Sequence, residues 1–234
     1  MVLWTVYTVS TLLSKKVRNL NMTVSALDLA SLLCSRLCHD MLSPVGALSN
    51  GLELLADEKD PEMRQRCFEL LEQSAKASAD KLKFFRLAFG AAGGFGEQVP
   101  VNEARPLVDA LVGANGRVAV NWMFGVDSLP KPAVKTLLNL ALIGLDALVR
   151  GGTLDVGAEV RDGVTEIVVR AAGQRIAFDP AIGQALEGAL PTSELSSRTA
   201  PAAMVHQLAA AVGGGVQVHI APDSLVLGAV LPSA

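Results

Sequence analysis

His39 and Asp40 form an adjacent pair whose residue types can do chemistry together in this 234-residue chain. The chain has three histidines, and an exposed imidazole is a competent nucleophile near neutral pH. Asp40 can accept a proton from one ring nitrogen and leave the other nitrogen free to attack an electrophile. We therefore expect His39 to be the catalytic nucleophile and Asp40 to be its proton acceptor.

The stretch around this pair predicts one long amphipathic helix over residues 25–56, because its apolar residues recur every three or four positions. At about 100° per residue, His39 lies diametrically opposite the centre of the apolar stripe, on the face that meets solvent. The apolar positions are Leu29, Leu33, Leu37, Met41, Val45, Leu48, Leu52 and Leu55.

Small and polar residues share the helix face of His39 and are candidate supporting or partner-binding residues. Arg36 can pair with an oxygen of a phosphoryl group. Ser43 and Gly46 give a partner surface close access to the imidazole, and Asn50 continues the same face. Taken alone, a surface histidine on a helix usually has no function, so these neighbours are what favours a reactive role for His39.

The cysteines and remaining histidines do not predict a metal site. An odd number of cysteines in a chain of this size favours a reducing compartment over a disulfide framework. Cys34 and Cys38 fall at the edge of the apolar stripe and do not converge with His39, so we expect them to be buried structural thiols. His206 and His219 are too few to complete a metal cluster.

A second long helix is predicted over residues 61–89, after a tight turn at 57–61 in which Asp60 caps the helix and Pro61 takes its first position. Two long helices with a short connection form an antiparallel hairpin. One hairpin cannot cover its own apolar stripe, so we expect residues 25–90 to form a homodimer with a four-helix bundle.

The glycine-rich segment 91–97 is predicted to be a linker, and residues 98–234 a second domain. This domain is expected to be a mixed α+β sandwich with helices on one face of a largely antiparallel sheet. Helices are predicted at 102–113, 131–149, 180–189 and 198–212, and strands at 117–124, 153–160, 164–171, 216–220 and 224–231.

Composition excludes several classes of protein. The net charge is −3 and hydrophobic residues make up 50% of the chain, which argues against disorder and against a nucleic-acid partner. The segment 1–24 is expected to be a flexible N-terminal extension. Its apolar run precedes its basic residues, the reverse of a signal peptide, and is too short to span a bilayer. We therefore expect a cytoplasmic protein without membrane contact.

The run from His39 to Pro44, with Asn50 beyond it, resembles the phosphoacceptor box of two-component histidine kinases. The domain order also matches that family, since a dimerising helical hairpin and a linker precede an α/β sandwich that resembles the histidine-kinase ATP-binding domain. Residues 137–140 resemble the start of the kinase asparagine box.

The second domain departs from the kinase pattern at the positions that would hold ATP. Ile143 stands where kinases have a magnesium-binding asparagine, Ala171 where they have the adenine-reading aspartate, and Arg175, Thr199 and Pro201 where they have glycines. Without these groups the domain lacks an acceptor for the adenine amino group, a metal ligand and close backbone approach to a triphosphate. We expect a degenerate ATPase domain that does not bind ATP.

A phosphoacceptor hairpin joined to such a domain is similar to the ChpT-type histidine phosphotransferases of alphaproteobacteria. The resemblance implies an enzyme that shuttles a phosphoryl group through His39. The group would come from the receiver domain of a hybrid histidine kinase and pass to response-regulator receivers that control the cell cycle. It also implies that this chain carries no cofactor of its own and that the Mg²⁺ used in transfer belongs to the receiver.

Two alternatives remain open from the sequence. One is an ATP-dependent histidine kinase with a divergent nucleotide site. The other is a non-catalytic module that binds receivers, which predicts that His39→Ala leaves function intact.

Overall fold

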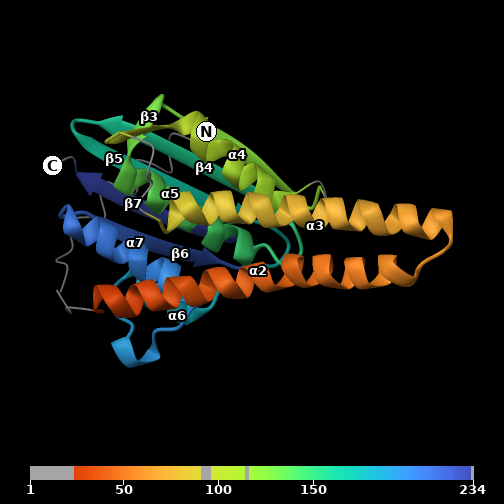
Figure 1. The fold of residues 1–234 in the computed structure, drawn as a ribbon. Coiled ribbons are helices and arrows are strands. Elements are labelled where there is room, and N and C mark those ends of the chain that lie inside the picture. The colour runs from red at the N-terminus through yellow and green to blue at the C-terminus, as the bar shows by residue number, and fades with distance from the viewer. Residues whose placement is uncertain (1–23, 91–95, 114–115, 233–234) are drawn as a thin grey trace.

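The computed structural model describes residues 24–90, 96–113 and 116–232 (Figure 1). The predicted extension at 1–24 and the predicted linker at 91–97 lie almost wholly outside these ranges. No helix among the described residues is long and apolar enough to cross a membrane.

The helical hairpin consists of α2 (Ala26–Asp57) and α3 (Pro61–Ala88), which lie side by side in Figure 1. The Asp60 side chain accepts hydrogen bonds from the backbone N–H groups of Glu62 and Met63, so the predicted cap of the second helix is confirmed. Arg64 donates to the backbone oxygens of Leu55 and Glu58. These bonds satisfy carbonyls at the end of α2 that have no partner within the helix.

Small residues line the contact between the two helices of the hairpin. Ser74 and Ser78 on α3 are buried, and so is Gly51 on α2. A Cβ atom added at Gly51 would come within 2.9 Å of the Leu71 side chain. The helices therefore approach each other closely at these small residues, and the Leu71 side chain packs against Gly51.

The remaining elements form an α/β sandwich. Its five-stranded sheet has the order β2-β4-β5-β7-β6, in which β2 and β4 are parallel and all other neighbours are antiparallel. The strands are β2 (Val118–Phe124), β4 (Gly152–Arg161), β5 (Val164–Ala172), β6 (Gly215–Ala221) and β7 (Ser224–Pro232). The helices are α4 (Val101–Val112), α5 (Lys131–Ala147), α6 (Pro180–Leu186) and α7 (Ala200–Ala211), with a 3₁₀ turn at Thr192–Glu194.

The predicted fold class, a helical hairpin followed by an α/β sandwich, is confirmed. Sequence analysis missed a small antiparallel sheet of β1 (Gln98–Pro100) and β3 (Ser128–Pro130). Strands of three residues that each end in proline are too short to show a period of two, so no pattern could predict them.

Three layers build the molecule, because α5 and α7 lie between the sheet and the base of the hairpin (Figure 1). Phe84 and Phe85 at the end of α3 belong to the same apolar core as α5 and the sheet. A second apolar cluster joins Leu29 and Leu33 of α2 to Ala203 of α7. The hairpin is thus packed against the α/β part at both of its helices.

A buried amide fixes this junction. Asn139 of α5 is fully buried, and its Nδ2 donates to the backbone oxygen of Ala88 at the end of α3, at 3.1 Å, and to that of Lys135 at 2.8 Å. A buried carbonyl without a partner would be destabilising. Asn139 therefore ties the end of the hairpin to the helical layer.

Glycine substitutions test the tightness of the packing. Gly144 of α5 faces the sheet, and a Cβ atom there would lie 2.7 Å from the Leu154 side chain and 3.2 Å from that of Val169. We expect Gly144→Ala to lower the free energy of unfolding by about 1–3 kcal/mol through overpacking. Urea denaturation monitored by circular dichroism measures this change.

Gly46→Ala is the matched control, because Gly46 is also a helical glycine but has nothing within 4 Å of an added Cβ. Alanine has the higher helix propensity, so this variant should gain up to about 1 kcal/mol. Equal effects of the two substitutions would show that α5 does not approach the sheet closely.

Candidate functional site

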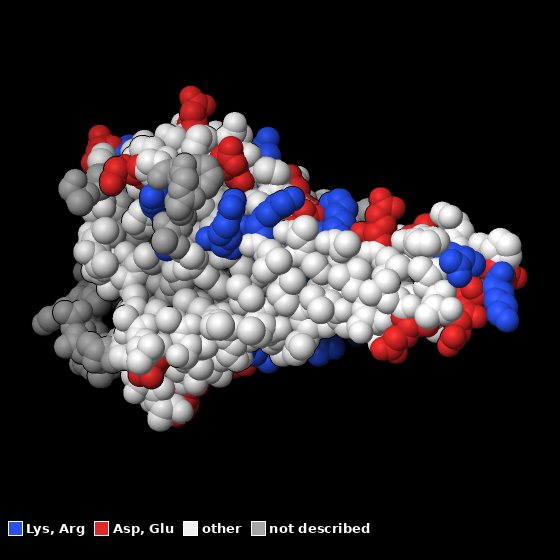
Figure 2. All heavy atoms as spheres, viewed as in Figure 1, with Lys and Arg blue, Asp and Glu red and all other residues white. Residues whose placement is uncertain are grey.

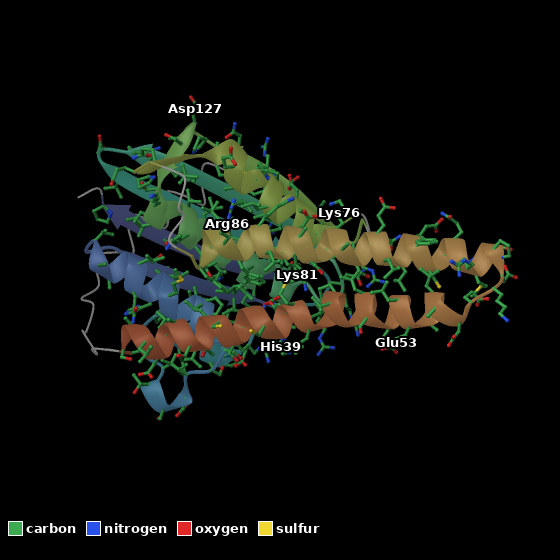
Figure 3. All side chains as sticks on the ribbon, in the orientation of Figure 1. His39, Glu53, Lys76, Lys81, Arg86 and Asp127 are labelled. Carbon is green, nitrogen blue, oxygen red and sulfur yellow. The ribbon has the colours of Figure 1, made fainter. Side chains whose placement is uncertain are left out.

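His39 stands on the solvent face of α2, and its side chain is 80% exposed. Figure 3 shows it on the side of α2 that faces away from α3. Its Nδ1 lies 3.1 Å from Oδ1 of Asp40. A carboxylate at this position accepts a hydrogen bond from Nδ1–H and so favours the tautomer with an unprotonated Nε2. The helical-wheel prediction that His39 is exposed is confirmed.

Asp40 lies between His39 and Arg36, and each of its two carboxylate oxygens has its own partner. Oδ2 accepts a hydrogen bond of 2.8 Å from Nε of Arg36, while Oδ1 faces the imidazole. The Asp40 side chain is only 17% exposed, so the carboxylate is held by neighbours rather than by water.

Arg36 differs from its predicted state. Its side chain is 12% exposed, and its Nη2 donates to Oδ2 of Asp146 in α5 at 2.8 Å. Burial acts to lower the pKa of the guanidinium, but attraction and hydrogen bonds from Asp146 and Asp40 outweigh it and raise the pKa above its ordinary value. Arg36 is therefore held in ion pairs with Asp40 and Asp146, so its Nε and Nη2 groups are engaged within the chain instead of free to meet a phosphoryl oxygen.

The backbone carbonyl of Asp40 has an unusual partner. Proline has no N–H, so Pro44 cannot make the helical hydrogen bond to the carbonyl four residues earlier. Lys81 of α3 donates its Nζ to this oxygen at 2.8 Å, and Figure 3 shows Lys81 between the two helices. The helix stays continuous past Pro44, and the turn carrying His39 is bonded to the second helix of the hairpin.

The other predicted supporting residues lie on the helix face of His39. Ser43 and Asn50 are exposed, and the space beside Gly46 is open. Asn50 lines a shallow surface hollow farther along α2, together with Glu53, Leu54, Asp57 and Glu58. No hydrogen bond joins these predicted residues to His39 among the described side chains.

The predicted apolar stripe is covered only in part within one chain, and the two cysteines beside it are not buried as predicted. The α2 residues that face α3 and the α/β part are Leu29, Leu33, Pro44 and Gly51. The other edge of the predicted stripe is open: Leu52 is 59% exposed, and Cys34 and Cys38 are exposed rather than buried. Periodicity finds the apolar side of a helix but not which of several neighbours covers each part of it.

Sequence analysis missed Lys81 and Asp146, two residues that hold the turn around His39. A weak signal existed for each. Pro44 implies that the carbonyl of residue 40 needs another donor, and Asp146 places a carboxylate in the last turn of a helix, where the helix dipole disfavours it. Neither signal says which distant residue is the partner. Within the described part of the chain, no group of three or more His, Cys, Asp or Glu residues can hold a metal ion.

Comparisons with known proteins identify the family. Residues 101–224 match the family described as "Histidine phosphotransferase C-terminal domain". The chain is 36% identical over 211 residues to "Protein phosphotransferase ChpT" of Brucella abortus (strain 2308), an alignment that covers 90% of this chain and 99% of that protein. The chain belongs to the histidine phosphotransferase family.

A solved structure of a similar protein shows the same fold. The "1.7 Angstrom Structure of a Bacterial Phosphotransferase" is 34% identical and superposes with a TM-score of 0.77, over 89% of this chain and 98% of that chain. A histidine kinase domain from Erythrobacter litoralis EL346 is a more distant match, with 13% identity and a TM-score of 0.44, over 80% of this chain and 95% of that chain.

Replacing Lys81 tests how the turn of His39 is held. Lys81→Met keeps an unbranched side chain but removes the donor to the Asp40 carbonyl. We expect the free energy of unfolding to fall by about 1–2 kcal/mol, because a half-buried acceptor loses its partner. Chemical denaturation of the two proteins measures the difference.

Lys76→Met is the matched control on the same helix. Lys76 pairs with Asp80 through an exposed ammonium group, and such pairs contribute at most about 0.5 kcal/mol. A loss at position 81 no larger than that at position 76 would mean that water, not Lys81, satisfies the carbonyl.

Proposed function

We propose that this chain is the histidine phosphotransferase of a two-component phosphorelay, with His39 as the phosphoacceptor. The observation that carries the proposal is the state of His39: its side chain is 80% exposed while its Nδ1 is engaged by Asp40 at 3.1 Å. One nitrogen is thus oriented by a carboxylate, and the other faces solvent where a partner can reach it. Membership of the histidine phosphotransferase family supports this role.

The transfer follows from this geometry. The lone pair of His39 Nε2 attacks the phosphorus of an aspartyl phosphate on the receiver; a P–N bond forms, the P–O bond breaks, and the receiver aspartate leaves as a carboxylate. Positive charge develops on the imidazole, and the Asp40 carboxylate stabilises it through the Nδ1 proton. The reverse sequence passes the phosphoryl group to a second receiver. The Mg²⁺ that neutralises phosphoryl charge belongs to the receiver.

The side of α2 that carries His39 offers a docking surface for the receiver. Beyond the open space at Gly46, the hollow beside Asn50 and Leu54 lies about three to four turns past His39 along the helix. Leu54 is 61% exposed, which gives this surface an apolar contact point. We propose that the receivers of a hybrid histidine kinase and of response regulators that control the cell cycle bind there, as the resemblance implies.

Packing supports the proposal that the donor is not ATP. The positions where a kinase has its nucleotide-binding groups are apolar and buried at Ile143 and Ala171, and Thr199 and Pro201 are also buried. Thr199 and Pro201 lie at the start of α7, and the neighbouring Ala200 belongs to the apolar cluster formed with α2. The first helix of the hairpin therefore packs against the start of α7, where two of the glycines expected of a kinase are replaced.

An unpaired apolar surface supports the proposed homodimer. Figure 2 shows a nearly uncharged band along both helices of the hairpin, with charged side chains at its margins and at the tip. Exposed apolar side chains repeat at helical spacing: Val45 and Leu52 lie seven residues apart on α2, and Phe68 and Leu82 lie fourteen residues apart on α3. A second copy presenting the same face would complete a four-helix bundle and cover these side chains.

The decisive test of function follows phosphoryl label without ATP. The full-length protein is mixed with a phosphorylated receiver domain and Mg²⁺, beside His39→Ala and beside a sample given labelled ATP alone. We expect acid-labile label on the wild type from the receiver only, and none on His39→Ala. Label from ATP alone would identify a kinase. Receiver binding that persists in His39→Ala, with no transfer to the wild type from any receiver, would identify a binding module.

Two substitutions on α2 distinguish the proposed dimer surface from the proposed docking surface. Leu52 and Leu54 are similarly exposed but point in directions about 200° apart around α2. We expect Leu52→Glu to shift the protein from dimer to monomer in sedimentation equilibrium, because it would bury charge in the bundle. We expect Leu54→Glu to remain dimeric but to weaken receiver binding. Loss of the dimer by both variants, or by neither, would contradict this assignment of faces.

A further inference from the structure

Arg36 joins two carboxylates that belong to different layers of the molecule. Its Nε donates to Oδ2 of Asp40 in α2, and its Nη2 donates to Oδ2 of Asp146 in α5, each at 2.8 Å. Asp40 in turn reaches the imidazole of His39 with its other oxygen. A continuous chain of hydrogen bonds therefore runs from α5, through Arg36 and Asp40, to the ring of His39.

Because the two donor groups of Arg36 bind two different carboxylates, one oxygen of Asp40 is left free of arginine. A guanidinium and a carboxylate favour the bidentate arrangement, in which two parallel N–H groups hold both oxygens. If Nη2 of Arg36 did not donate to Asp146, it could donate to the second oxygen of Asp40. The Nδ1–H of His39 would then share its acceptor oxygen with a charged and stronger donor, which weakens its own hydrogen bond.

The position of Asp146 argues that it serves this arrangement rather than the stability of its own helix. It lies in the last turn of α5, where the partial negative charge of the helix end repels a carboxylate. Its side chain is 47% exposed, so water screens this end of the ion pair and limits what the pair contributes to folding. Arg36 is the partner of Asp146 among the described side chains.

We infer that Asp146 is a positioning residue for phosphoryl transfer. By holding Nη2 of Arg36, it limits Arg36 to one oxygen of Asp40 and leaves the other oxygen to accept from Nδ1 of His39. The α/β part of the chain thus contributes to the site in the hairpin and is more than a passive scaffold. This inference rests on the proposed role of His39. Asp146 touches neither the reacting nitrogen nor the phosphoryl group, and it acts through Arg36 and Asp40.

Asp146→Asn in the full-length protein is the test. The amide is similar in size but loses the charge that competes for Arg36. We expect the rate of transfer from a phosphorylated receiver to fall by about three- to thirtyfold. We also expect ¹⁵N NMR of the imidazole to show a larger share of the tautomer protonated at Nε2. Asp146→Glu, which keeps the carboxylate, should restore most of the rate and the tautomer ratio.

Asp155→Asn is the matched control. Asp155 also pairs with an arginine of the α/β part, Arg170 at 3.1 Å, but lies in the sheet and not on α5. It should leave both the transfer rate and the imidazole tautomer unchanged. A fall in rate equal to that of Asp146→Asn would overturn the inference, because any lost ion pair would then suffice.

The route through Asp40 is tested by combining substitutions. Once Asp40 is replaced in Asp40→Ala, Asp146→Asn should cause no further loss of rate. An additional loss of the same size in that background would overturn the inference. If the wild type accepted no label, the proposed function would fail. The NMR measurement would still decide whether Asp146 controls the tautomer of the His39 imidazole. An unchanged tautomer ratio in Asp146→Asn would overturn the inference by itself.

Discussion

The packing of the hairpin base onto α5 and α7 is the constraint on which the rest of this structure depends. Phe84 and Phe85 enter the core of the α/β part, and Asn139 holds the end of α3 through the Ala88 carbonyl. These contacts set the position of α2 relative to α5. The bridge from Arg36 to Asp146 spans the same two elements, so it exists only because this packing is fixed.

The same constraint joins both helices of the hairpin to the α/β part. The start of α7 is in contact with α2 in an apolar cluster, and the buried Asn139 adds a directional contact at α3. Burial of such surface strongly favours one arrangement over others. The turn that carries His39 is therefore held at a defined position beside α5.

The sequence predicted the parts of the fold that have a strong period. The long helices and every strand of the main sheet were found, because each extends over several turns or alternations. It predicted the exposure of His39 from spacing alone. It did not predict the state of Arg36, since the carboxylate of Asp146 is 110 residues away in the chain and only tertiary packing brings the two together. Local spacing likewise could not show that Cys34 and Cys38 lie on the uncovered side of α2.

Preorganisation explains why so many contacts converge on one turn of α2. An exposed side chain on an isolated helix samples several rotamers, and each productive encounter would then include the entropy of selecting one. Lys81 fixes the backbone of Asp40, and Arg36 fixes its carboxylate, so the imidazole meets an acceptor that is already in place. All these contacts lie on the side toward α3 and α5. The His39 side chain is nevertheless 80% exposed, so this rigid support leaves the imidazole open to solvent.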